Sequence, residues 1–177
     1  MRPVFIDVDT QMDFLFPAGA LYVPGSESVI PQIQRLNQHA ISCGFPLVAT
    51  VDAHAEDDTE FKTWPPHCIK GTLGQRKAAA TIVPGQIVVE KQEIDFYQNP
   101  SFQAALAQFE ADRYVVYGVV TEYCVRSAAF GLLETGKPVA VVADAIYSIS
   151  PSEGSRIISD FAARGGIVTA VGAVCGQ

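Results

Sequence analysis

Nucleophilic catalysis is the chemistry indicated by three residues that each follow an apolar run: Asp9, Lys91 and Cys124. Cys124 falls in the first turn of a predicted helix, whose N-cap we expect to be Thr121. Backbone N–H groups and the helix dipole at that position favour the thiolate and lower the pKa of the thiol. The same N–H groups could stabilise a developing oxyanion. Cys124 is therefore the candidate nucleophile.

The remaining cysteines are not at such positions. A small buried core residue is the common role of an intracellular cysteine, and we assign that role to Cys43, Cys68 and Cys175. The sequence contains no Cys-x-x-Cys pair, which argues against zinc-ribbon and thioredoxin-type sites. We expect all four thiols to be free, as is usual in a cytoplasmic protein.

Asp9 and Lys91 are the candidates to assist the thiol. A carboxylate at a strand end, partly shielded from water, can take the thiol proton and later return it to a leaving amine. The alternative role for such a residue is a turn or helix cap, which we expect for Asp13. Lys91 can hold a thiolate electrostatically and orient Asp9, although most lysines are ordinary surface residues. Their positions at strand ends favour the catalytic interpretation.

A second group of polar residues indicates a metal site. Asp52 and His54 are two residues apart, so at the end of an extended strand their side chains point the same way. His67 follows two prolines that stiffen the chain, and Glu60 lies between the two histidines. Imidazole and carboxylate donors suit one divalent metal ion, either zinc, iron or manganese, with zinc slightly favoured. Solvated loop residues are the alternative, but two of the three histidines lie in this one loop.

An alternation of strands and helices must position these side chains. Apolar runs predict strands at residues 2–8, 45–51, 86–90, 113–117, 138–142 and 166–170. Helical periodicity and stop signals predict helices at residues 26–42, 100–109, 122–134 and 152–164. Such a pattern is typical of a parallel sheet covered on both faces. We therefore predict an α/β fold: a single doubly wound domain over residues 1–177 with a six-stranded, mostly parallel sheet.

Residues 52–84 depart from this alternation, being irregular and rich in polar residues and proline. Long irregular segments inside compact domains are usually functional. In an open parallel sheet, ligands bind at the carboxyl ends of the strands. We therefore expect Asp9, Asp52, Lys91 and Cys124 to converge on one edge of the sheet, beside an irregular metal-binding loop.

Composition and charge exclude several classes of partner. The 177 residues are 49% hydrophobic and 18% charged, which is typical of a globular protein. A net charge of −7 argues against nucleic acid or an anionic membrane as a partner, because both require a basic surface. No apolar run approaches the length of a membrane span, and the first residues do not match a signal peptide. We expect a cytoplasmic protein.

Taken together, the motifs resemble the isochorismatase-like cysteine hydrolases and, within them, the nicotinamidases. The resemblance runs along nearly the whole chain, in the order of the family's motifs. It is carried by Val8-Asp9-Thr10-Gln11-Met12-Asp13-Phe14, Asp52-Ala53-His54, Trp64-Pro65-Pro66-His67-Cys68, Lys91 and Gly118-Val119-Val120-Thr121-Glu122-Tyr123-Cys124-Val125. The Asp-x-His and Trp-Pro-Pro-His segments are the ones that resemble nicotinamidases specifically.

The resemblance implies a catalytic triad and a set of metal ligands. The triad would be Asp9, Lys91 and Cys124, and the ligands would be Asp52, His54, Glu60 and His67. Many relatives have a histidine where Glu60 stands, and the neighbouring carboxylates leave Asp57 and Asp58 open as alternatives. Glutamate keeps a competent ligand at this position but adds negative charge.

The resemblance also implies how a substrate would be held. Phe14, Trp64 and Tyr123 would surround the ring of nicotinamide, a small-molecule amide. A cis peptide bond between Val119 and Val120 would help to aim the N–H groups of Val120 and Cys124 at the oxyanion. The implied reaction releases nicotinate and ammonia, as in NAD salvage. Membership of this family further implies a homo-oligomer.

Three alternatives remain open at this level. Relatives in the same superfamily hydrolyse ureido or carbamoyl compounds, and pyrazinamide is a further candidate substrate. Some isochorismatase-like domains are binding modules, a role that does not require Asp9, Lys91 and Cys124 together. Cleavage of a vinyl ether, the isochorismatase reaction, needs no thiol, so Cys124 argues against it.

Overall fold

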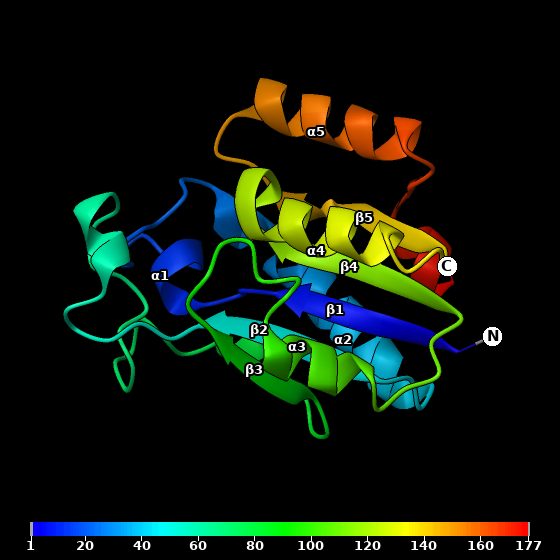
Figure 1. Cartoon of the computed structure of the whole chain (residues 1–177), viewed down its shortest axis with the longest axis horizontal. Helices are drawn as coiled ribbons and strands as arrows, with labels where there is room; N and C mark the ends of the chain where they lie inside the picture. Colours follow the sequence, from blue (N-terminus) through cyan, green and yellow to red (C-terminus); the bar gives the residue numbers. More distant parts are fainter. Residues whose placement is uncertain (1, 177) are drawn as a thin grey trace.

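The structure, a computed structural model, describes residues 2–176. Six strands form one sheet in the order β3-β2-β1-β4-β5-β6, and each neighbouring pair is parallel (Figure 1). Their bounds are β1 Pro3–Val8, β2 Leu47–Asp52, β3 Ile87–Lys91, β4 Arg113–Val119, β5 Val139–Tyr147 and β6 Ile167–Thr169. The predicted α/β fold with a six-stranded sheet is confirmed, and the sheet is parallel throughout.

Helices cover both faces of this sheet (Figure 1). One face carries α1 (Met12–Leu15), α2 (Ile30–Ser42) and α6 (Val171–Cys175). The other carries α3 (Pro100–Leu106), α4 (Arg126–Leu133) and α5 (Pro151–Ala163). Each face of the sheet therefore packs into its own apolar core.

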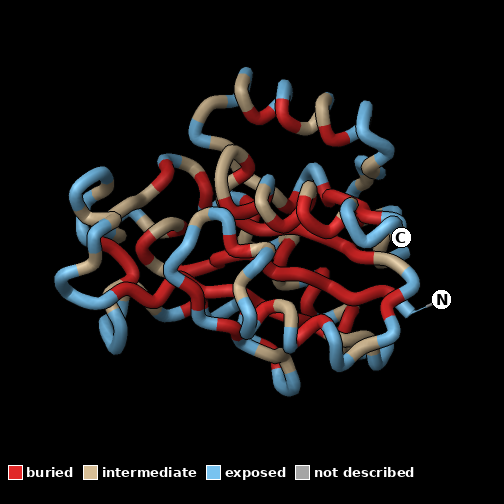
Figure 2. The backbone as a smooth tube through the Cα atoms, in the orientation of Figure 1, coloured by how far each residue is buried: buried red, intermediate tan, exposed pale blue. Residues whose placement is uncertain are grey.

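Alternation along β1 explains why there are two cores. Phe5 belongs to the core under α2, whereas Ile6 and Val8 belong to the core under α4. Successive strand residues point to opposite faces, so a strand buried on both sides is largely apolar. The exception in β1 is Asp7, whose buried carboxylate is paired with Lys77. Figure 2 shows this burial as a continuous buried band along the central strands.

The predicted helices form with small differences at their ends. The segment predicted at 26–42 begins with a 3-10 turn, η1 (Ser26–Val29), and becomes α2 at Ile30. Pro31 occupies the first turn of α2, where proline is tolerated because its missing N–H has no helical partner. Ile33, Leu36 and Ala40 then form the buried stripe of the helix.

The strand order reverses between β1 and β4, and this reversal fixes the location of the site. Chain segments leave β1 and β4 in opposite directions, which opens a crevice at the carboxyl ends of these two strands. Asp9 follows β1 directly, and Cys124 lies five residues beyond the end of β4. The topology therefore brings these two side chains to one crevice.

β5 is the main departure from the predicted elements. A strand was predicted at residues 138–142, but β5 continues to Tyr147. The pairing with β4 shifts register between Val116 and Gly118, after which Gly118 pairs with Ile146. This irregularity carries the strand past Ala143 and Asp144, which are exposed and interrupt the apolar pattern. As a result, Tyr147 reaches the crevice.

The irregular segment between β2 and β3 is anchored by buried polar contacts. It contains the short turns η2 (Thr59–Lys62) and η3 (Ala79–Thr81). The side-chain amide of Gln11 donates hydrogen bonds to the carbonyls of Asp52 (2.8 Å) and Gln75 (2.7 Å). The buried ammonium of Lys77 lies 2.7 Å from the Asp7 carboxylate. These contacts hold the loop against β1.

Across residues 2–176, the helices are too short or too polar to cross a bilayer.

Candidate active site

The three candidate catalytic residues meet at the crevice. The Lys91 ammonium lies 3.4 Å from the Cys124 sulfur and 2.9 Å from Asp9 Oδ2. Lys91 is the last residue of β3 and pairs in register with Asp52, the last residue of β2. The Lys91 ammonium also donates a hydrogen bond to the Asp52 carboxylate. All four side chains are buried. The predicted convergence of these strand ends is therefore what the structure contains.

Asp9 is held in a specific orientation. Its backbone φ of 49° lies in the left-handed region, which is uncommon for a residue with a side chain. The Thr50 hydroxyl donates a 2.7 Å hydrogen bond to Oδ1. Oδ2 forms the ion pair with Lys91 but accepts no well-aligned hydrogen bond from the described residues. Oδ2 is thus available to accept a proton from the nearby thiol.

Burial dominates the electrostatics of this cluster. Burial raises the pKa of the Cys124 thiol well above its usual value, and the Lys91 charge only partly opposes this. The pKa of Asp9 is raised for the same reason, again against the effect of Lys91. Burial alone would lower the pKa of Lys91, but the charges of Asp9, Cys124 and Asp52 raise it well above its ordinary value. Lys91 therefore stays charged among three acidic groups.

Two expectations about the nucleophile were wrong. Thr121 is not the N-cap but the first residue of a π-helical turn, Thr121–Val125, which precedes α4, and Val120 caps it. The Thr121 hydroxyl donates instead to the Tyr147 carbonyl, 3.0 Å away. The thiol pKa is also raised rather than lowered, because desolvation by burial outweighs the lowering effect of the Lys91 charge. A protonated thiol needs a proton acceptor before it attacks, and Asp9 Oδ2 is positioned for that role.

The peptide bond between Val119 and Val120 is cis, as the family resemblance implied. The preceding Gly118 has a φ of 120°, and a Cβ there would lie 2.1 Å from the Val8 carbonyl oxygen. Only glycine fits this close approach of β4 to β1. Val120 and Cys124 both line the cavity at the crevice, which is where the predicted oxyanion donors must lie.

The candidate metal ligands also come together. Potential ligand atoms of Asp52, His54 and His67 all lie within 4.8 Å of one another, and all three residues are buried. His54 Nε2 is buried without a hydrogen-bond partner among residues 2–176. A buried imidazole nitrogen without a partner is costly unless something binds it. The donor set and this free nitrogen fit a divalent metal ion.

Contacts on the far side of each imidazole fix which nitrogen is free. His54 Nδ1 lies 3.0 Å from the Asp58 carboxylate, and His67 Nδ1 lies 2.8 Å from the Pro65 carbonyl. Both acceptors require a proton on Nδ1, which leaves the Nε2 lone pairs available. Such outer contacts are typical of histidines that bind metals.

Glu60 lies beside this group without joining it closely. Its carboxylate is 3.9 Å from His67 Nε2, and it lines the cavity. Asp58 is engaged with His54 Nδ1 and with the Glu60 N–H, so it faces away from the Nε2 atoms. Asp57 is exposed. Of the three carboxylates, Glu60 alone lines the cavity, while Asp58 contacts Nδ1 of His54.

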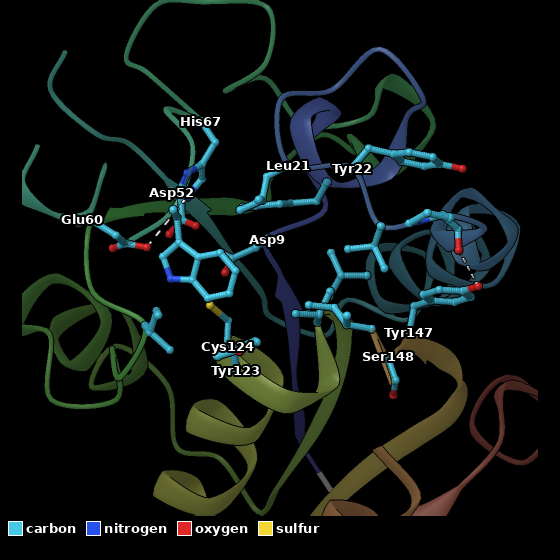
Figure 3. A pocket seen from close by; sticks show the side chains of 18 of the residues that line it. Asp9, Leu21, Tyr22, Asp52, Glu60, His67, Tyr123, Cys124, Tyr147 and Ser148 are labelled. Carbon is cyan, nitrogen blue, oxygen red and sulfur yellow. Dashed lines mark hydrogen bonds and ion pairs between the residues drawn. The ribbon is translucent and has the colours of Figure 1, made fainter. Parts of the chain in front are cut away.

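A cavity of about 550 Å³ joins the two groups (Figure 3). Asp9, Asp52 and Cys124 line it, and their potential ligand atoms lie within 4.8 Å of one another. The three predicted ring-binding residues line it as well: Phe14, Trp64 and Tyr123. The rings of Trp64 and Tyr123 meet edge to face at 5.5 Å, and that of Phe14 lies 5.7 Å from His67. An aromatic substrate would therefore be enclosed by aromatic rings.

Several cavity residues were not predicted from the sequence. They are Leu21, Tyr22, Val23, Pro24, Ile94, Tyr147, Ser148, Ile149 and Pro151. They come from loops and from the ends of β5 and α5, in segments that carry no chemical motif. The sequence analysis also missed three hydrogen-bond partners of the site residues: Thr50, Gln11 and Asp58. Only the contact of Asp58 with His54 had a signal in the sequence, namely their four-residue spacing.

Comparisons with known proteins agree with this geometry. The family model described as the Isochorismatase domain matches residues 3–172. The nicotinamidase of Escherichia coli K12 is 26% identical over 192 residues, which cover 89% of this chain and 90% of the relative. The N-carbamoylsarcosine amidase of an Arthrobacter species is 26% identical over 136 residues, covering 71% of this chain and 52% of the relative.

A solved structure extends this similarity to the whole fold. The pyrazinamidase of Pyrococcus horikoshii, crystallised in complex with zinc, superposes with a TM-score of 0.90 at 28% sequence identity. The match covers 96% of this chain and 99% of the Pyrococcus horikoshii chain. This chain and that pyrazinamidase therefore share one fold along nearly their whole length.

Proposed function

This chain belongs to the isochorismatase family and is a nicotinamidase-type amidohydrolase, and we propose that it hydrolyses nicotinamide to nicotinate and ammonia. One observation carries the proposal. Asp52 belongs both to the group with His54 and His67 and to the group with Asp9 and Cys124. A thiol nucleophile and a metal-type ligand set thus share one cavity, which suits an amide attached to a metal-binding ring.

The proposed metal ligands are Asp52, His54 and His67, with Glu60 beside them as the fourth candidate. Two imidazoles and carboxylates favour zinc slightly over iron and manganese. When bound, the ion would supply a Lewis acid that fixes the pyridine nitrogen of the substrate. Phe14, Trp64 and Tyr123 would enclose the ring and leave its carboxamide facing Cys124.

The chain's own residues account for the covalent steps. The Cys124 sulfur attacks the carboxamide carbon as its proton passes to Asp9, and Lys91 stabilises the negative charge of the sulfur. Backbone N–H groups of Val120 and Cys124 hold the oxyanion. Asp9 then gives the proton to the departing ammonia, leaving a thioester between the nicotinoyl group and Cys124. Asp9 then takes a proton from water, whose oxygen attacks the thioester carbon. The C–S bond breaks, nicotinate is released, and the proton on Asp9 returns to the Cys124 sulfur.

A ureido or carbamoyl acid is the second candidate substrate, because N-carbamoylsarcosine amidase is among the relatives. The cavity disfavours it. Its charged lining side chains are acidic (Asp9, Asp52 and Glu60), and Lys91 is already paired with Asp9 and Asp52. Among the described residues that line the cavity, a substrate carboxylate would therefore find no unpaired cationic side chain. Neutral nicotinamide and pyrazinamide meet no such penalty.

The substrate assignment is tested by ammonia release from the metal-loaded protein. We expect nicotinamide to be hydrolysed and N-carbamoylsarcosine to be inert. A chelator should stop hydrolysis of nicotinamide, and added zinc should restore it. Turnover of the ureido compound alone would assign the other substrate class. We propose NAD salvage in the cytoplasm as the setting of this reaction. We also propose that residues 1–177 form one domain, and assembly into a homo-oligomer stays a prediction.

A further inference from the structure

The cavity extends well beyond the Cys124 region. Figure 3 shows Asp52, Glu60, His67 and Cys124 at one end and Tyr22, Tyr147 and Ser148 at the other. Its volume of about 550 Å³ lies within the range of about 300–1,000 Å³ that is typical of pockets for drug-sized ligands. Nicotinamide consists of one ring and one carboxamide, so it leaves much of this space unfilled. We call the far part the apolar arm; it is lined by Tyr22, Val23, Pro24, Tyr147, Ile149 and Pro151, with Ser148 as its one other polar side chain besides the tyrosines.

We propose that the apolar arm binds an uncharged aryl group attached to the ring of the amide substrate. This inference rests on the proposed function, since it concerns the same cavity. It assigns the chain a preference for ring-substituted pyridine carboxamides over nicotinamide itself.

The chemistry of the arm favours an aryl group. None of its lining residues is charged. Both tyrosine hydroxyls are occupied by other partners: that of Tyr147 donates to the Pro24 carbonyl (2.9 Å), and that of Tyr22 donates to Glu27 (2.7 Å) and accepts from the Gly25 N–H (2.9 Å). The tyrosines therefore offer ring surface rather than free hydrogen-bonding groups, and such surface binds aromatic rings well.

The wall of the arm that contains Ile149 is tied to the nucleophile turn. The carboxylate of Glu122, two residues before Cys124, accepts hydrogen bonds from the N–H groups of Ile149 (3.2 Å) and Ser150 (2.8 Å). At the start of the same segment, Thr121 donates to the Tyr147 carbonyl. This wall is consequently fixed relative to Cys124.

The opposite wall is tied to α1. The N–H groups of Leu21 and Val23 donate to the carbonyls of Asp13 and Phe14, each at 3.1 Å. The bond from Tyr147 to Pro24 joins the two walls. Both walls are therefore built before a ligand arrives, and preformed apolar sites bind with little ordering cost.

The first test measures binding and turnover of phenyl-substituted nicotinamides, one isomer for each free ring carbon. Binding is measured by calorimetry on the metal-loaded Cys124→Ala variant, and turnover is measured on the unmutated enzyme. We expect at least one isomer to bind about tenfold more tightly than nicotinamide, the scale set by burying an added apolar group. The matching carboxyphenyl isomer should show no such gain. If every phenyl isomer binds no better than nicotinamide, the inference is wrong.

The second test moves a charge into the arm. Ile149 and Ile82 are exposed to a similar degree, 52% and 54%, but only Ile149 lines the cavity. Ile149→Arg should reverse the preference, so that the carboxyphenyl isomer binds more tightly than the phenyl isomer. Ile82→Arg is the matched control and should leave the preference unchanged. Equal behaviour of the two variants would overturn the inference.

The outcomes separate this inference from the proposed function. If nicotinamide is hydrolysed but no phenyl isomer binds more tightly than nicotinamide, the inference about the apolar arm is wrong and the proposed function is supported. If a phenyl isomer binds more tightly and Ile149→Arg reverses that preference, but no amide is hydrolysed, the proposed function is wrong and the inference about the apolar arm is supported. If a second copy of this chain covers the arm instead, the phenyl isomers gain nothing and Ile149→Arg lowers the molecular mass in solution. That result also overturns the inference.

Discussion

Lys91 donates toward the sulfur of Cys124 across 3.4 Å, with both side chains buried. The same ammonium contacts the carboxylates of Asp9 and Asp52. A single cation thus neutralises a potential thiolate, the proposed general base and a proposed metal ligand. Removing it would leave several acidic groups close together in a low-dielectric site, so we expect Lys91 to matter for stability as well as for the proposed catalysis.

Lys91→Met should therefore lower the free energy of unfolding strongly. Loss of one partner from a buried ion pair costs about 3–5 kcal/mol, because the remaining charge is left without compensation. Lys70→Met is the matched control, since Lys70 pairs with Glu90 at 3.6 Å on the surface, with both side chains more than half exposed. It should cost under about 1 kcal/mol. Urea unfolding at one fixed metal concentration measures both, and equal losses would contradict this account.

Asp9→Asn should remove the proton acceptor while keeping the shape of the side chain. General acid–base catalysis contributes about 10²–10⁴-fold to a rate, so kcat for nicotinamide should fall within that range. KM should change much less, because Asp9 carries no proposed contact with the ring. Steady-state kinetics on metal-loaded protein separate the two parameters. A variant with nearly unchanged kcat would remove Asp9 from the mechanism.

Asp58→Asn should weaken metal binding although Asp58 is not a proposed ligand. Its carboxylate lies 3.0 Å from His54 Nδ1 and fixes the ring with Nε2 free. Loss of such an outer partner costs about 10–100-fold in metal affinity. Asp57→Asn, on the exposed neighbour, is the control and should have no effect. Competition with a chromophoric chelator measures both affinities. If Asp57→Asn lowered the metal affinity more than Asp58→Asn, the assignment of Asp58 as the residue that orients His54 would be wrong.

The sequence predicted the strand-end residues because apolar strands with ionisable residues at their carboxyl ends form a local pattern. Asp9, Asp52, Lys91 and Cys124 could be located in this way without knowledge of the strand order. Their direct contacts could not be predicted in the same way. Thr50 bonds Asp9, and Gln11 bonds the backbone of Asp52, only because the sheet brings distant segments together.

The extent of the cavity could not be predicted from the sequence for a related reason. Its apolar arm combines residues 22–24 with residues 147–151, and neither segment contains a chemical motif. Tyr147 reaches the site because β5 continues through a register shift that the apolar pattern does not signal. The direction of the Cys124 pKa shift was mistaken because the burial of the thiol depends on the folded structure.

The most direct test of the central claim is ammonia release from nicotinamide by Cys124→Ala, compared with the unmutated enzyme at matched metal content. Cys124 is not a proposed ligand, so the variant should bind metal with unchanged affinity. Because Cys124 is the one cysteine among the described residues that line the cavity, the rate should fall by at least about 10³-fold, the scale of losing a nucleophile. Ammonia release that persists near the original rate in the metal-loaded variant would contradict the account.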